Sequence, residues 1–341
     1  MRSGKLCWVV VLLLVLLGLG WTSTTASAQE IKLKWSTFYP VAHPLGPMYQ
    51  KWGDEISKRT NGKVKISYFF AGTLLKGNEL YEGVVKGVSD MGESVVGYTR
   101  GRFPAMESIC LPMGYPDAMN ATEIANEFYK KFKPKEFEDT KVLLLHAHGP
   151  GILHSKKPVH KLEDVQGLKI RSDSYSAKVA KALGGVPVAM TMAETYESLQ
   201  KGVVEATLSP LEAMQTWKQA EVVKYTTDSR VVGYTSVFYC VMNMKKWNSL
   251  PKDVQKVFEE VSAEYIPKFG ALWDYTEEEA RKYVLARGNT IISLPNDEAA
   301  KWVKAVEPVM DEYVKDAESK GLPGKEYVKF VQEGVAKYSK K

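Results

Sequence analysis

Short stretches that alternate apolar and polar residues are separated along the chain by amphipathic stretches. Residues 31–35 and 64–68 alternate as half-buried strands do. Between them, Pro44 can open a helix that runs to about Thr60, and Asn61-Gly62 supplies its stop signal. A helix over 78–86 and a short strand over 90–96 come next. This part of the chain therefore predicts a β-α-β-α-β unit with helices on the faces of a mostly parallel sheet.

A glycine-proline break at Gly149-Pro150-Gly151 divides this pattern, and the alternation of strands and helices restarts after it. The elements expected around the break are a helix over 117–132, strands over 141–148, 168–171, 186–190 and 203–208, and helices over 175–183, 193–201 and 210–219. Two successive α/β units predict an α/β fold of two lobes, each with a mostly parallel sheet flanked by helices.

The C-terminal third has a different character. Residues 231–243 are rich in β-forming side chains, and helical periodicity then runs over most of 251–287. A helix of that length exceeds the usual average of about 11–12 residues, so we expect it to span both lobes. One strand over 289–292 and two helices, over 297–321 and 324–337, complete the expected elements.

Residues 1–28 have the pattern of a secretory signal peptide. Arg2 and Lys5 precede the apolar run Cys7–Trp21, and Ala26-Ser27-Ala28 forms a small-x-small cleavage pattern. The alternative is an uncleaved anchor, but the run of 15 residues is shorter than the roughly 20 that a spanning helix needs. We therefore expect a secreted mature chain that begins at Gln29 and does not insert directly into the membrane.

Composition narrows the class of protein. The 341 residues are 45% apolar and 25% charged, as in a folded soluble protein. The net charge of +6 is spread without a long Lys/Arg block, so nucleic-acid binding has little support. Cys110 and Cys240 both lie in apolar surroundings, which favours buried thiols, although an oxidising compartment also permits a disulfide.

Recognisable catalytic motifs are absent from the sequence. No GxSxG elbow, phosphate-binding loop or HExxH motif occurs. His146 and His148, with His154 nearby, form the one metal-like cluster, but no Cys or carboxylate stands at ligand spacing. We therefore expect neither a metal nor a cofactor. Because a site can also be assembled from scattered residues, a secreted α/β enzyme acting on carboxylic acids, with His148 as base, remains the alternative.

Arg171 is the strongest candidate for binding. It ends a predicted strand just past the break, and ligands of open α/β sheets bind at the carboxyl ends of strands. An arginine can hold a carboxylate through two parallel hydrogen bonds, which a lysine cannot. From position alone, however, a solvated surface arginine is the commoner case.

The segment Leu162–Arg171 (LEDVQGLKIR) resembles the DLKGLKIR signature of TRAP-type (tripartite ATP-independent periplasmic) transporter substrate-binding proteins, the DctP-like family. Further segments that resemble the family follow one another in the expected order: Thr60–Val64, Met190–Tyr196 with Leu199–Glu205, Glu221–Tyr225 and Leu250–Gln255. The resemblance covers essentially all of residues 30–320.

This resemblance implies a two-lobed periplasmic binding protein fold with a long helix bridging the lobes. Lobe I would comprise 29–148 plus about 236–280, and lobe II 149–235 plus about 281–325, with 326–341 as a C-terminal helix. A carboxylate would be captured in the cleft between the lobes and delivered to membrane-embedded TRAP transporter subunits, with an ion gradient driving uptake. No reaction would be catalysed. A sensor-linked binding protein is a further alternative.

Arg171 matches the family arginine that holds the substrate carboxylate. The resemblance also places Phe38, Ser94, Val95, Met192 and Ser209 at or near the cleft. Large apolar and aromatic side chains add the candidate walls Trp35, Tyr39, Tyr98, Trp217 and Tyr239, each of which could equally pack in a core.

The expected ligand class follows from these candidates and from two differences between this chain and family members that bind sialic acid. Members that bind sialic acid have a second arginine about twenty residues before Arg171, where this chain has Gly151, Ile152 and Leu153, and Ser209-Pro210 replaces part of their E-N-P motif. We therefore expect a small carboxylate with an apolar or aromatic body, or a short hydroxy- or keto-acid. Glu212 could accept a hydrogen bond from a ligand hydroxyl or ammonium, but we expect a solvated helix residue there.

Overall fold

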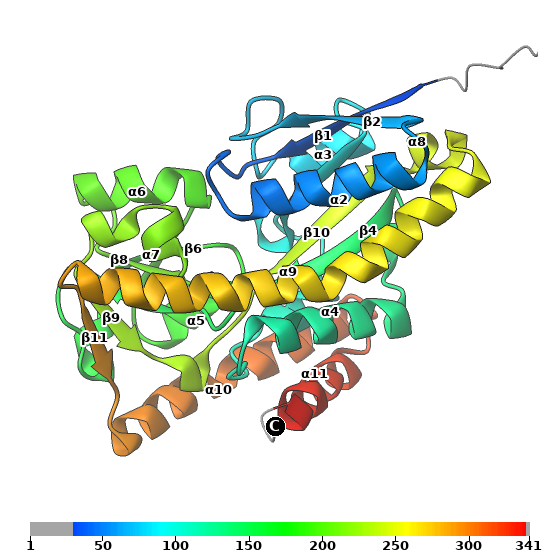
Figure 1. The fold of residues 1–341 in the computed structure, drawn as a ribbon. Helices are drawn as coiled ribbons and strands as arrows, with labels where there is room; N and C mark the ends of the chain where they lie inside the picture. Colours follow the sequence, from blue (N-terminus) through cyan, green and yellow to red (C-terminus); the bar gives the residue numbers. More distant parts are fainter. Residues whose placement is uncertain (1–29, 339–341) are drawn as a thin grey trace, which may run out of the picture.

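The computed structural model describes residues 30–338, and the predicted signal peptide lies outside this range. The described chain forms two β-sheets with helices on their faces (Figure 1), which confirms the α/β class. The five-stranded sheet has the order β2-β1-β3-β10-β4 and defines the first lobe. Its strands are β1 (Ile31–Thr37), β2 (Val64–Phe69), β3 (Met91–Val95), β4 (Thr140–Ala147) and β10 (Val237–Asn243).

A six-stranded sheet of order β11-β9-β5-β8-β6-β7 defines the second lobe. Its strands are β5 (Ile152–Ser155), β6 (Lys169–Ser172), β7 (Val186–Ala189), β8 (Ala206–Ser209), β9 (Tyr225–Asp228) and β11 (Thr290–Ser293). Every strand falls within the residue ranges expected for its lobe. The lobe boundaries themselves stay a prediction.

Helices cover the sheets and connect them. In the first lobe and its surroundings these are α2 (Leu45–Arg59), α3 (Leu80–Val85), α4 (Ala118–Phe132), α8 (Met244–Ser249) and α11 (Gly324–Tyr338). The second lobe contains α5 (Ser176–Ala182), α6 (Met192–Lys201) and α7 (Ala213–Thr216), while α9 (Lys252–Ala286) and α10 (Asn296–Ser319) are the long helices. No helix among residues 30–338 combines the length and the apolar character needed to cross a bilayer.

Crossing segments make both sheets mixed rather than purely parallel. The chain passes from β4 to β5 through residues 148–151 and returns from β9 to β10 through residues 229–236. As a result β10 is antiparallel to both β3 and β4, and β5 is antiparallel to both β8 and β9. The remaining pairs, such as β1 with β2 and β6 with β8, are parallel. Strands β5 and β9 are short and follow irregular segments, and the hydrophobic pattern did not predict them.

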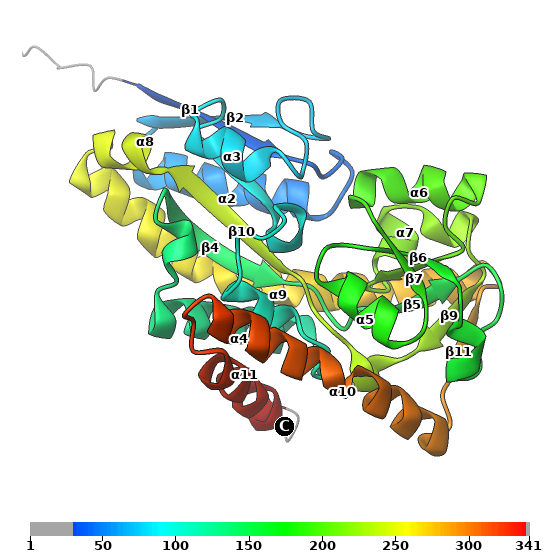
Figure 2. The same cartoon turned by 180° about the vertical axis from the view of Figure 1, so that it is seen from behind.

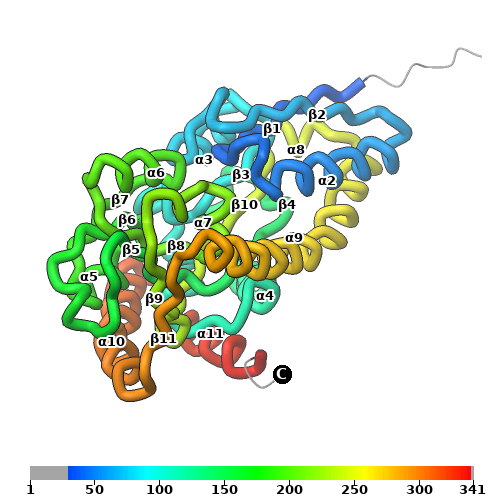
Figure 3. The backbone as a smooth tube through the Cα atoms, turned by 60° about the vertical axis from the view of Figure 1, so that its left-hand side comes forward, coloured from blue at the N-terminus to red at the C-terminus, as the bar shows by residue number. Residues whose placement is uncertain are grey.

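The 35-residue helix α9 bridges the lobes, as its length predicts. It packs on α2, α4 and β4 at one end and on α7 and β11 at the other. Figures 1 and 3 show it running along the molecule from one sheet to the other. Its buried face includes Phe258, Phe269 and Trp273, so one amphipathic element contributes to the core of the first lobe and reaches the junction between the lobes.

The two faces of the first sheet have separate cores. On one face Trp35 of β1 lies 4.5 Å, between ring centroids, from Tyr49 of α2. On the other face Tyr239 of β10 lies 5.5 Å from Tyr81 of α3. Behind the sheets, α10 and α11 run across the base of the molecule (Figure 2), and α11 packs on α4. Cys110 and Cys240 are both buried free thiols, the arrangement that their apolar surroundings favour.

Candidate functional site

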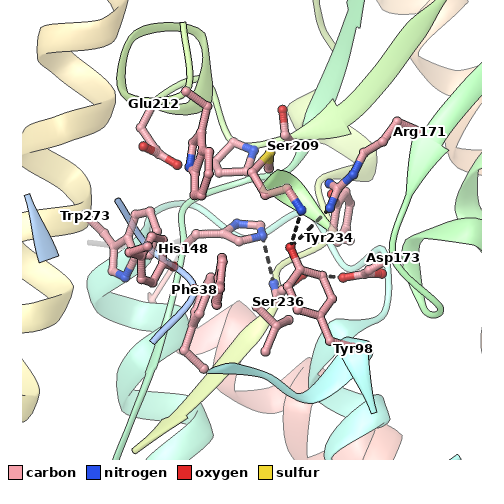
Figure 4. A pocket seen from close by; sticks show the side chains of 16 residues that line it. Phe38, Tyr98, His148, Arg171, Asp173, Ser209, Glu212, Tyr234, Ser236 and Trp273 are labelled. Atoms are coloured by element: carbon pink, nitrogen blue, oxygen red, sulfur yellow. Dashed lines mark hydrogen bonds between the residues drawn. The ribbon is translucent and has the colours of Figure 1, made fainter. Parts of the chain in front are cut away.

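A cavity lies where the two lobes meet, near the middle of α9 (Figure 4), and has an empty volume of about 390 Å³ including its mouth. The residues lining it are Phe38, Tyr39, Val95, Tyr98, His148, Arg171, Asp173, Met192, Ser209, Pro210, Glu212, Trp217, Tyr234, Ser236, Phe238 and Trp273. Both lobes, both crossing segments and the long helix therefore contribute to it.

Arg171 is held at one end of the cavity by strand β6 and is only 4% exposed. Its guanidinium donates to the carbonyl oxygens of Met190 (3.0 Å) and Leu208 (3.4 Å) and to the hydroxyl of Tyr98 (3.3 Å). Its Nε has no hydrogen-bond partner, and no described carboxylate lies within ion-pair distance of the group. A buried cation without an anionic partner is costly, so the site is arranged for an anion from outside the protein.

Tyr98 stands beside Arg171 and belongs to the opposite lobe. Its hydroxyl oxygen accepts hydrogen bonds from Arg171 and from the backbone N–H of Met192, the latter at 2.8 Å. Because both of these bonds use the oxygen as acceptor, the hydroxyl proton is left to donate to a ligand. Burial raises the pKa of Tyr98, which keeps the proton in place.

Asp173, two residues after Arg171, is the acidic group closest to it in sequence, but its oxygens are already used. Oδ1 accepts from the backbone N–H groups of Tyr175 (3.0 Å) and Ser176 (2.7 Å) and from the hydroxyl of Ser176 (2.8 Å). Oδ2 accepts from the hydroxyl of Ser236 at 3.0 Å. These bonds hold Asp173 as a structural acceptor that ties the start of α5 to the crossing segment before β10.

His148 lies on the other crossing segment, and both of its ring nitrogens are engaged. Nδ1 donates to the carbonyl oxygen of Gly149, and Nε2 accepts from the backbone N–H of Ser236 at 3.1 Å. Burial lowers the pKa of His148 to about 4, so the ring is neutral. A histidine fixed in this way connects the two crossing segments and has no free nitrogen for a reacting group.

Aromatic rings form the walls between the polar ends of the cavity. Phe38 and Tyr39, from the loop after β1, stack with centroids 4.3 Å apart. Trp217, after α7, lies nearly parallel to Phe38 at 6.1 Å. Phe238 of β10 and Trp273 of α9 close the floor with centroids 5.2 Å apart. Aromatic walls of this kind suit a ligand whose body is flat or apolar.

Glu212 occupies a second polar position in the cavity, in the turn between β8 and α7. It is 2% exposed, which contradicts the expectation of a solvated helix residue. The helix expected over 210–219 forms only from Ala213 to Thr216, so Glu212 precedes it and faces inward. Its Oε2 accepts from the Thr216 hydroxyl and lies 3.5 Å from His43 Nε2.

A buried polar cluster supports the aromatic wall from behind. Glu93 of β3 is fully buried, accepts from the Thr37 hydroxyl at 2.7 Å and faces His146 at 3.8 Å. Burial raises the pKa of Glu93 to about 8 and lowers that of His146 to about 3. His146 accepts from the indole N–H of Trp273 at 2.9 Å, which orients one of the rings lining the cavity.

The lobes are in contact across the cavity, so this is a closed arrangement. Besides the bonds of Tyr98, the hydroxyl of Ser174 donates to the carbonyl oxygen of Gly97 at 2.6 Å. A Cβ on Gly97 would lie 3.0 Å from the carboxyl group of Asp173. A ligand therefore needs the lobes to separate before it can enter.

Seven of the nine predicted site residues line the cavity: Arg171, Phe38, Tyr39, Val95, Met192, Ser209 and Trp217. Ser94 and Tyr239 do not, and this part of the prediction needs correction. They are opposite one another across β3 and β10, while their neighbours Val95 and Phe238 form the next pair. Because successive side chains of a strand point to opposite faces, Ser94 and Tyr239 lie on the α3 side of the sheet.

Other residues of the site were missed or given another role. Trp35 was a candidate wall but is fully buried in the core between β1 and α2, whereas Tyr98 does line the cavity. Tyr234, Ser236, Phe238 and Trp273 come from a crossing segment, β10 and the long helix. Nothing in the local sequence marks them, because only the crossing topology brings them to the cavity.

The histidines are not grouped as metal ligands. His154 contacts the Thr226 hydroxyl and the Ser209 carbonyl oxygen, away from the partners of His146 and His148. Residues 30–338 contain no group of three or more His, Cys, Asp or Glu side chains that could hold a metal ion.

Comparison with known proteins places this geometry in a family. The model of DctP, the bacterial extracellular solute-binding protein family 7, matches residues 35–316. The C4-dicarboxylate-binding periplasmic protein DctP of Rhodobacter capsulatus is 28% identical over 296 residues, which are 85% of this chain and 88% of that protein.

Two solved structures are similar along nearly their whole length. A marine-metagenome TRAP solute-binding protein specific for aromatic acid ligands, in complex with meta-hydroxyphenylacetate, has a TM-score of 0.86 at 30% identity, with 91% of this chain and 99% of that chain covered. A TRAP solute-binding protein from Rhodoferax ferrireducens, in complex with copurified benzoate, has a TM-score of 0.86 at 28% identity and the same coverage. The two-lobed α/β architecture, the buried arginine in the cleft and the family match agree: the chain belongs to the bacterial extracellular solute-binding proteins of family 7, a family of solute receptors and not of enzymes.

Proposed function

We propose that this protein captures a small carboxylate with an aromatic or apolar body between its two lobes and delivers it to the membrane-embedded subunits of an ion-gradient-driven TRAP transporter. The observation that carries the proposal is the buried guanidinium of Arg171, which has no carboxylate partner among the described residues. A ligand anion supplies that partner.

The carboxylate binds at the end of the cavity formed by Arg171 and Tyr98. The arginine offers its charged guanidinium, and the tyrosine offers its hydroxyl proton. Charge-assisted hydrogen bonds of this kind are about twice as strong as neutral ones. The two donors belong to opposite lobes, so a carboxylate held by both stabilises the closed arrangement.

The body of the ligand lies against the aromatic wall of Phe38, Trp217 and Phe238. A flat ring gains both apolar burial and ring contacts in such a place. The aromatic acids bound by the marine-metagenome and Rhodoferax proteins fit the same description and support this ligand class. A polyhydroxylated sugar acid does not suit these walls.

Capture proceeds by closure of the lobes around the ligand. In the open state Arg171 and Tyr98 are separated and hydrated, and the anion then joins them and shifts the population toward the closed state. Helix α9 and the two crossing segments are the connections about which the lobes move. Release to membrane partners is the reverse step, favoured when those partners stabilise the open form.

We further propose that no reaction accompanies binding. His148 is the candidate base of the enzymatic alternative. Its ring is neutral, and both nitrogens are hydrogen-bonded, to Gly149 and Ser236, so neither is free to act on a substrate. The signal-like pattern of residues 1–28 supports export to the periplasm, where a receptor of this kind would meet its ligand and the membrane subunits.

Isothermal titration calorimetry with benzoate, mandelate, succinate and glucuronate tests the proposed function. We expect binding of the aromatic acids, accompanied by a ligand-dependent rise in Tm. Analysis of the recovered ligand should show it chemically unchanged. If none of these carboxylates binds while a neutral or cationic solute does, the proposal is wrong. Conversion of the acid at enzyme-level protein concentration would support the enzymatic alternative.

A further inference from the structure

The cavity has a second polar end that binding of a simple aromatic acid leaves unused. Glu212 lies on the chain just past β8 and is 2% exposed, so its carboxylate is held away from bulk water. No described lysine or arginine lies within ion-pair distance of it. Buried polar groups almost always have hydrogen-bond partners, so each oxygen of this carboxylate is expected to have a donor.

One oxygen of Glu212 is fixed by the protein. Oε2 accepts from the Thr216 hydroxyl and faces Nε2 of His43, 3.5 Å away. The backbone N–H of Leu45 donates to Nδ1 of His43 at 3.3 Å, which puts the ring proton on Nε2, toward the carboxylate. These contacts hold the side chain in one orientation.

The other oxygen, Oε1, accepts no hydrogen bond from any described residue. Unlike Nε2 of His43, it is not sealed in by protein atoms, and Glu212 is part of the cavity lining (Figure 4). An acceptor that belongs to a cavity-lining residue and lacks a protein donor is matched by a donor on the ligand.

We propose that the ligand carries a hydrogen-bond donor on its body, a hydroxyl or an ammonium group, and that Glu212 accepts from it while Arg171 holds the carboxylate. This inference rests on the proposed function and makes Glu212 the residue that selects among aromatic acids. An acid without the donor binds more weakly, because it does not make this hydrogen bond to a charged acceptor.

The test uses the full mature protein, freed of copurified ligand, and calorimetry with matched acids. The probes are benzoate, 3- and 4-hydroxybenzoate, 3-methoxybenzoate and 3-(aminomethyl)benzoate. We expect at least one donor-bearing acid to bind about tenfold or more tightly than benzoate, in line with a hydrogen bond to a charged group. 3-Methoxybenzoate, which has the oxygen but no hydroxyl proton, should bind no more tightly than benzoate. The hydroxyl and ammonium probes show which donor the site prefers.

The variant Glu212→Gln keeps the shape of the side chain and removes its charge. It should lose most of the preference for the donor-bearing acid while its affinity for benzoate stays within about twofold, because benzoate makes no bond to this end. Glu278→Gln, an equal change of charge at an exposed position of α9, is the control and should leave both affinities unchanged. If Glu212→Gln fails to fold, the affinities of the wild-type protein for the series of acids still show whether a donor on the ligand strengthens binding.

The outcomes separate this inference from the proposed function. If benzoate binds but no donor-bearing acid binds more tightly, the role of Glu212 is refuted and the carboxylate receptor stands. The same holds if Glu212→Gln weakens benzoate and the donor-bearing acid equally. If no carboxylate binds at all, both proposals are refuted.

Discussion

Replacing Arg171 by methionine should abolish tight carboxylate binding while leaving the ligand-free protein folded. Methionine fills much of the same volume and cannot pair with an anion. Within the protein the guanidinium makes only three hydrogen bonds, at 3.0, 3.3 and 3.4 Å, and its Nε makes none. Its contribution therefore depends mainly on the ligand.

Removing one partner from a buried charge pair costs about 2–5 kcal/mol. Since each 1.4 kcal/mol is a tenfold change in affinity, benzoate should bind Arg171→Met at least about 30-fold more weakly than wild type. Arg171→Lys should also bind poorly, because an ammonium group cannot form the two parallel bonds of the guanidinium. The ligand-free variant should unfold at a Tm no lower than that of wild type, since the unpaired buried cation is itself unfavourable.

Calorimetry with benzoate gives the affinities, and thermal unfolding with and without benzoate gives the stabilities. Arg100→Met, an equal change of charge at an exposed residue, is the control for long-range electrostatics and should bind as wild type does. Unchanged affinity in Arg171→Met, or an equal loss in Arg100→Met, would refute the assignment of Arg171 as the carboxylate ligand.

Three further changes test other parts of the account. Tyr98→Phe removes the donor from the opposite lobe, so benzoate should bind roughly tenfold more weakly; unaltered affinity by calorimetry would exclude that donor. Gly97→Val places side-chain atoms against Asp173, so small-angle scattering should show no ligand-induced compaction; normal compaction would argue against the closed contact. Because burial raises the pKa of Glu93 to about 8, this carboxyl group holds its proton in the folded state and loses it in the unfolded state between about pH 4.5 and 8, so the contribution of Glu93 to wild-type stability falls as pH rises through that window. In denaturant unfolding, the free energy of unfolding of Glu93→Gln should therefore rise relative to that of wild type as the pH rises. A difference that does not change with pH would contradict the raised pKa of Glu93.

The sequence predicts most of the architecture because the periodicity of its main elements is strong. The strand over 64–68 and the long helix expected over 251–287 correspond to β2 and α9 within about a residue. Strand β5 was missed since Ile152–Ser155 is only four residues and directly follows the glycine-proline break. Its pairing with β8 and β9 is a tertiary feature that a local pattern does not contain.

The structure brings to the cavity the arginine that a motif marked, and it departs from the prediction where only the direction of a strand's side chains decided the outcome. Arg171 was identified from its motif and lies in the cavity. On β10 the choice between Phe238 and Tyr239 depends on which face of the sheet meets the second lobe, and both side chains are aromatic. Glu212 was assigned to a solvated helix because nothing in its local sequence shows that α7 is short and that the turn before it faces inward.

The proposed function requires the guanidinium of Arg171 to hold a ligand carboxylate between the lobes. A crystal structure of the protein with bound 3-hydroxybenzoate would show whether it does. We expect a carboxylate within hydrogen-bond distance of Arg171 and of the Tyr98 hydroxyl, with the ring against Phe38 and Trp217. A carboxylate bound elsewhere, with Arg171 turned away from it, would contradict the account.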